Sequence, residues 1–136
     1  MLASATCPCT GGTLDKLIQP AILAALAKGP LHGYKLAEGI GRMPLFRGQK
    51  PDLSGVYRAL KAMESRGFVV SSWDLSESGP ARKSYRATEA GEQCLLHWIE
   101  TLEQYRRGIT VLLKTARTAL AGTEGARGNA SSRRNN

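Results

Sequence analysis

The strongest constraint on the fold is an apolar repeat near the C-terminus, in which the steps between apolar residues alternate between three and four. The repeat continues without interruption over three heptads. Its positions are Leu95, Trp98, Leu102, Tyr105, Ile109, Leu112 and Ala116. Such spacing is typical of one long helix whose apolar seam packs against another helix. We expect this helix to run from residue 88 to about residue 120, a length of roughly 45–50 Å at 1.5 Å per residue.

The seam requires a partner, because a small domain cannot cover that much apolar surface by itself. A second copy of the chain is the favoured partner, so the seven seam residues are the predicted dimer interface. Part of the seam is also expected to contact the first helix of the other copy. Gly108 costs about 1 kcal/mol relative to alanine in a helix interior, but it permits two helices to approach closely. A long helix folded back on the first helix of its own chain is the alternative.

Three shorter helices are predicted before the long C-terminal helix, and the first two of them lie nearest the N-terminus. An apolar stripe from Leu14 to Leu26 indicates the first of them. Its regular part is expected to begin near Pro20, because a proline inside a helix removes a hydrogen bond. Gly29 and Pro30 then end it. The second helix is expected over residues 32–40.

The third short helix is predicted to start at Asp52 or Ser54, either of which can cap it, and to end at Gly67. After it, residues 68–75 and 82–87 are rich in β-branched and aromatic residues and flank a Ser-Glu-Ser-Gly-Pro turn, which predicts a β-hairpin. The expected fold is therefore mainly α with a small β-hairpin, a winged helix-turn-helix followed by a long helix. The predicted segments are a flexible leader at 1–13, a winged-helix domain at 14–87, a dimerisation helix at 88–120 and a disordered basic tail at 121–136.

The charge of the chain is compatible with a polyanionic partner. The formal net charge is +8, and residues 42–83 carry eight basic and four acidic groups. An excess of this kind is where nucleic acid would be met, although a solvated basic surface without a partner is the alternative. No apolar run approaches the ~20 residues that span a bilayer. The N-terminus lacks the features of a secretion signal, so we expect a cytoplasmic protein without a membrane contact.

In a winged helix-turn-helix the third helix enters the major groove and the hairpin lies along the neighbouring backbone or minor groove. Ser54 lets the helix N-terminus approach a phosphate. Arg58 is the best candidate for a base edge, because a guanidinium can bond guanine in bidentate fashion. Lys61 is expected on a phosphate. Tyr57 either places its hydroxyl on a phosphate or packs in the core.

The tip of the hairpin carries two adjacent cations, Arg82 and Lys83, which is what a wing requires, whereas a hairpin taken alone would suggest a solvated turn. The pieces LHGYKLAEGI (31–40), LSGVYRALKAMESRGFV (53–69) and GPARKSYRATEAG (79–91), with the helix that carries Trp98, follow in order. In that order and spacing they resemble the small, single C-terminal helix branch of the PadR family of winged-helix repressors, over about residues 14–120.

The resemblance implies a homodimer that represses a nearby promoter by binding an inverted-repeat operator in double-stranded DNA, and that a small molecule releases. It also implies that Tyr34 holds phosphate together with the third-helix and wing residues named above. Val56 stands where the family often carries threonine, which removes a hydroxyl from a phosphate or capping contact. By the same resemblance Trp98 is a candidate for binding a flat apolar or aromatic effector, although a core tryptophan is the favoured interpretation.

Three cysteines without a secretion signal do not form a disulfide framework. Cys7 and Cys9 could begin a soft-metal site or sense oxidation, but spare positions in a flexible leader are the favoured explanation. His32 is expected to be a hydrogen-bonding residue at a helix start rather than a metal ligand or a base. The sequence therefore indicates no cofactor.

Two other classes of function fit the sequence less well. An enzyme lacks support, because His32 and His97 lie in separate helices and neither paired acids nor a Ser/His/Asp arrangement is present. A winged helix that binds a protein partner is the other alternative. Such modules tend to lack cations on the third helix and wing, which this chain retains. We therefore expect a DNA-binding transcriptional regulator.

Overall fold

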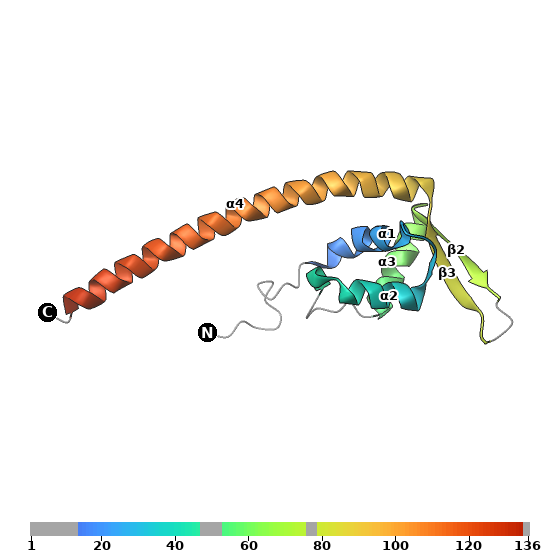
Figure 1. Ribbon diagram of the computed structural model, residues 1–136, viewed down its shortest axis with the longest axis horizontal. Coiled ribbons are helices and arrows are strands. Elements are labelled where there is room, and N and C mark those ends of the chain that lie inside the picture. The colour runs from blue at the N-terminus through green and yellow to red at the C-terminus, as the bar shows by residue number, and fades with distance from the viewer. Residues whose placement is uncertain (1–13, 47–52, 76–78, 135–136) are drawn as a thin grey trace. The chain divides into compact units, whose positions relative to one another are not determined.

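The structure is a computed structural model that describes residues 14–46, 53–75 and 79–134. Its elements follow the chain in the order η2 (Leu14–Leu17), α1 (Ile18–Leu26), β1 (Leu31–His32), α2 (Gly33–Arg42), η3 (Pro44–Phe46), α3 (Leu53–Ser65), β2 (Val69–Asp74), β3 (Arg82–Ala87) and α4 (Glu89–Arg134) (Figure 1). The chain divides into two units, the first ending at Trp98 and the second beginning at Ile99. The first unit is the predicted mainly helical fold. None of the described helices is long and apolar enough to cross a bilayer.

The start of α1 follows from the position of Pro20. The 3-10 turn η2 precedes α1, and Pro20 is the third residue of α1. The first backbone N–H groups of a helix have no acceptor within the helix, so a proline there breaks no hydrogen bond. The predicted irregular turn before a regular helix is therefore present. Gly29, with φ +142°, lies in the turn that follows α1.

Three helices and the sheet enclose one core. It consists of Ala21, Ile22, Leu23, Leu26, Leu36, Ala37, Ile40, Phe46, Val56, Leu60, Met63, Val69 and Tyr85. Each large aliphatic side chain buried here stabilises the fold by about 1.5–3 kcal/mol relative to an exposed position. The first turns of α4 close this core, because Cys94, Leu95 and Trp98 pack against it.

The sheet has three strands in the order β1-β3-β2, rather than the two of the predicted hairpin. The hairpin itself is β2 and β3, paired antiparallel from Val69 opposite Ala87 to Asp74 opposite Arg82. β1 adds the third strand, and the sequence had placed His32 of this strand at the start of the second helix. A strand of two residues has no alternating pattern, so nothing local distinguishes it from a loop or a helix start.

Two caps hold the junction between α3, the sheet and α4. At the end of α3 the N–H of Phe68 donates to the Met63 carbonyl at 2.9 Å, and Gly67 adopts φ +81°. This is the glycine-terminated helix end that the sequence predicted. At the start of α4 the Thr88 hydroxyl accepts from the Gly91 N–H at 3.0 Å and donates to the Gly67 carbonyl at 2.6 Å. The Thr88 N–H also donates to the Phe68 carbonyl at 3.0 Å.

The second unit is the remainder of α4. The sequence predicts that the helix ends near residue 120 and that a disordered tail follows, whereas α4 continues to Arg134. The residues after 120 include glycines, each of which costs about 1 kcal/mol in a helix, but no proline that would remove a hydrogen bond. The backbone hydrogen-bond ladder can therefore continue past the end of the apolar repeat.

Candidate nucleic-acid interface

Helix α3 separates its core residues from its predicted DNA contacts. Val56, Leu60 and Met63 are buried. The other face is exposed and carries Ser54, Tyr57, Arg58 and Lys61. Positions three and four apart lie on one face of a helix, so these four side chains form one polar, cationic stripe. Because Val56 is completely buried, the residue at which the chain departs from the family pattern belongs to the core and not to this stripe.

The start of α2 lies directly beside Tyr57. A Cβ atom on Gly33 would stand 2.5 Å from Cε1 of the Tyr57 ring, so only glycine permits this approach. The next two residues, Tyr34 and Lys35, are exposed, and the Tyr34 side chain is 65% exposed. The Tyr57 ring therefore lies against the start of α2 and outside the buried core, with 41% of it exposed, and its contact with a phosphate stays a prediction.

The wing, formed by β2 and β3, has one face toward the start of α2 and Tyr57. Residues opposite each other on paired strands point to the same side of a sheet, so Ser71 and Tyr85 share a face with Trp73 and Lys83. Tyr85 is almost fully buried, and the ammonium of Lys83 lies 5.7 Å from the centre of its ring. Burial, and then the neighbouring Tyr57 and Glu64, raise the pKa of Tyr85 above 10.0, so its hydroxyl stays protonated at neutral pH.

Two polar contacts fix the wing relative to the helices. The Ser71 hydroxyl donates to Glu64 Oε1 at 2.6 Å, which joins β2 to α3. His32 Nε2 lies 3.2 Å from Asp74 Oδ2, which joins β1 to the outer end of β2. His32 stands at the N-cap position of α2, but its side chain does not cap that helix. The predicted structural role of His32 thus takes the form of a bridge to the wing.

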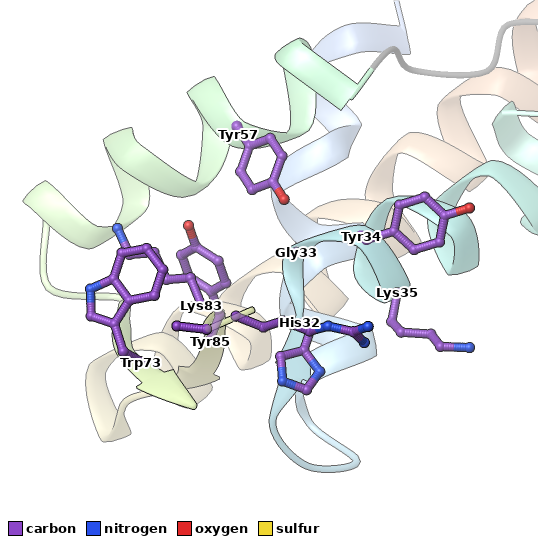
Figure 2. Close-up of a pocket in the computed structure, with 10 residues that line it drawn as sticks. His32, Gly33, Tyr34, Lys35, Tyr57, Trp73, Lys83 and Tyr85 are labelled. Carbon is purple, nitrogen blue, oxygen red and sulfur yellow. The ribbon is translucent and has the colours of Figure 1, made fainter. Parts of the chain in front are cut away.

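These elements enclose an open cleft between α2, α3 and the wing (Figure 2). Its lining residues are His32, Gly33, Tyr34, Lys35, Tyr57, Trp73, Ala81, Arg82, Lys83 and Tyr85. Four of the seven predicted DNA contacts are among them, and Ser54, Arg58 and Lys61 lie outside it on the exposed face of α3. The lining combines aromatic rings with cations and contains no acidic side chain among the described residues. Such a surface suits an anionic partner.

Three residues of the cleft were missed from the sequence. Lys35 follows Tyr34 on the first turn of α2, and Tyr85 lies beneath the wing cation Lys83. Trp73 is the largest omission, because it is 63% exposed and lies directly opposite Lys83 (Figure 2). The alternation of Val69, Ser71 and Trp73 along β2 was the available signal, since it places all three on one face of the strand.

The predicted dimer residues fall into two groups. Leu95 and Trp98 are partly buried against the core of the first unit. In the second unit Leu102 is partly buried, whereas Tyr105, Ile109, Leu112 and Ala116 are exposed along α4. Further exposed apolar residues accompany them on the same helix: Leu96, Ile99, Val111, Leu113 and Leu120.

No group of three or more potential metal ligands is present among the described residues. Cys7 and Cys9 lie outside the described residues, so the hypothesis of a soft-metal or redox site there stays a prediction. Cys94, partly buried beside the core, is a free thiol.

Residues 22–97 match the model of the transcriptional regulator PadR-like family. The chain belongs to this family. It resembles a transcriptional regulator from Thermoplasma acidophilum at 35% identity, covering 74% of this chain and 94% of that one, with a TM-score of 0.65. A PadR family regulator from Clostridium difficile is 25% identical over 71% of this chain and 97% of its own, with a TM-score of 0.58.

The PadR of Bacillus subtilis, solved in complex with operator DNA, is 28% identical, with coverage of 61% of this chain and 46% of that one and a TM-score of 0.54. A comparison with curated proteins gave no significant match. The PadR-like chain is thus a winged-helix transcriptional regulator with a long C-terminal helix, and its family is one of regulators rather than enzymes.

Proposed function

We propose that this PadR-like regulator binds an inverted-repeat operator as a homodimer, represses the adjacent promoter and is released by a small-molecule effector. The observation that carries the proposal is the convergence of predicted DNA contacts from α2, α3 and the wing on one cationic cleft, beside the exposed stripe of α3. The operator complex of the B. subtilis relative supports the same use of the fold. This role implies a cytoplasmic location.

The place of each predicted contact residue in the fold supports its proposed role. Arg58 and Lys61 stand on the exposed face of α3, where Arg58 reads a base edge and Lys61 holds a phosphate. Ser54, in the first turn of α3, lies where backbone N–H groups attract a phosphate. The remaining phosphate contacts come from Tyr34 and Tyr57 with the two wing cations, Arg82 and Lys83.

The dimer follows from the exposed seam of α4. A single winged helix reads about half of a typical operator, and two copies read half-sites about 34–36 Å apart. Tyr105, Ile109 and Leu112 would lose their exposure to water against the α4 of a second copy. Effector binding at Trp98 remains part of the proposal, although the packing of Trp98 against the core favours a structural role for it.

The proposal is tested by fluorescence-anisotropy titration of the protein into labelled DNA from upstream of its own gene. A scrambled duplex of equal composition is the control, and both are titrated at several salt concentrations. Tight binding to one fragment, with affinity that falls steeply as salt rises, is the expected result. Equal and weak binding to every genomic fragment tried would instead favour a winged helix that serves a protein partner.

A further inference from the structure

The wing carries a tryptophan that the fold does not cover. Trp73 is 63% exposed, although burial of a ring this large is among the strongest sources of stability in a small domain. It continues a face of the sheet whose inner end is the core. Val69 is completely buried on this face, Ser71 is partly buried, and Trp73 projects beyond the core. Its position is therefore set by the register of the strands and not by packing.

Cations share the cleft with the Trp73 ring. Lys83 lies directly opposite Trp73, and Lys35 and Arg82 line the same cleft. The Lys83 ammonium is also held over the ring of Tyr85 at 5.7 Å. The nearest carboxylate on the outer end of β2, that of Asp74, is bonded to His32. The cleft thus combines the flat apolar ring of Trp73 with the positive charges of Lys35, Arg82 and Lys83.

The sugar–phosphate backbone of DNA has the complementary pattern, because apolar deoxyribose faces alternate along it with phosphates. We propose that Trp73 lies against the deoxyribose of the DNA backbone, between phosphates held by Lys83 and by the start of α2. This inference rests on the proposed function and adds an apolar, sequence-independent contact to it. Duplex DNA fits the cleft better than a neutral partner does, because Lys83 lies directly opposite Trp73 and the other predicted DNA contacts of the cleft line it together with the ring.

An apolar contact and an ionic contact differ in how they respond to salt. Replacing Lys83 by alanine removes one released counterion, so the slope of log K against log salt should fall in magnitude by about 1. Trp73→Ala removes no charge. It should weaken binding by about tenfold at every salt concentration and leave the slope unchanged. Ser72→Ala, on the other face of the same strand, should change neither quantity.

Tryptophan fluorescence reports on the contact of Trp73 directly, because the chain has only two tryptophans and each can be studied alone. The variant Trp98→Phe leaves Trp73 as the sole tryptophan, and Trp73→Phe leaves Trp98 as the matched control. A random-sequence duplex at low ionic strength is the probe, because a backbone contact does not require an operator. Binding is followed by the anisotropy of the labelled duplex, and the environment of the ring by its emission and by acrylamide quenching.

The expected result is a shift in Trp73 emission and a loss of quenching, with the same midpoint as the anisotropy change and without a matching change for Trp98. Anisotropy that rises while Trp73 stays equally quenched would overturn the inference and leave DNA binding intact. Absence of any anisotropy change at low ionic strength would overturn the proposed function and the inference together. Should Trp98→Phe fail to fold, the salt series of Trp73→Ala decides, because that variant retains Trp98: an unchanged affinity would refute the contact.

Discussion

Replacing Gly91 by alanine adds one methyl group where the first turn of α4 meets the end of α3. The new Cβ would stand 2.1 Å from the carbonyl oxygen of Phe68, 3.1 Å from its carbonyl carbon and 3.4 Å from Cδ2 of Leu23. The nearest of these atoms belongs to the backbone, which cannot rotate away as a side chain can. The same oxygen accepts the hydrogen bond from the Thr88 N–H, so any displacement also weakens the start of α4.

The magnitude follows from three effects. Forcing a methyl group into a filled space costs about 1–3 kcal/mol, and losing the hydrogen bond and the Thr88 cap costs about 1 kcal/mol each. Alanine regains about 1 kcal/mol of helix propensity over glycine. We therefore expect the free energy of unfolding to fall by about 2–4 kcal/mol, a loss of roughly 10 °C or more in Tm for a domain of this size.

The control is Gly39→Ala in α2, where nothing lies within 4 Å of the added Cβ and only the gain in helix propensity, up to about 1 kcal/mol, applies. Both variants are unfolded by urea and by heat under circular dichroism at one fixed protein concentration, since the proposed dimerisation would make Tm concentration-dependent. The two substitutions should shift stability in opposite directions. A Gly91→Ala variant as stable as the parent would refute the close approach of α4 to Phe68.

Three further predictions address the interface, the dimer and the core. Arg58→Ala should weaken binding to the operator by about 1–3 kcal/mol and relax sequence preference in anisotropy titrations; equal weakening for all duplexes would contradict base reading. Glutamate at Leu102 or Ile109 should give monomers in light scattering, and a variant that remains dimeric would place the interface elsewhere. Because burial raises the pKa of Tyr85 above 10.0, its hydroxyl favours the fold below pH 10, and this contribution is lost as pH rises further. Tyr85→Phe should flatten that alkaline loss in urea titrations between about pH 8 and 11; an equal loss in both proteins would assign it to other groups.

The sequence alone determined the order and type of the main elements. Amphipathic spacing in α1, α2 and α3, the glycine that ends α3 and the heptads of α4 are signals carried by residues a few positions apart. The same local periodicity separated the buried face of α3 from the exposed stripe of Ser54, Arg58 and Lys61. Among the helices, the far end of α4 departed most from this pattern, because the apolar repeat ends before the helix does.

Contacts between distant residues were decided by the tertiary structure. The strand β1 exists because Leu31 pairs with Tyr85, and the bridge from His32 to Asp74 spans 42 positions of the chain. The cleft likewise arises only when the start of α2 packs under Tyr57 and the wing register places Trp73 beside Lys83. Local periodicity states which face of an element is apolar, but not which other element will cover it. That choice depends on the packing of the whole core, so the sequence named candidate contact residues on single elements, and the structure brought four of the seven together in the cleft.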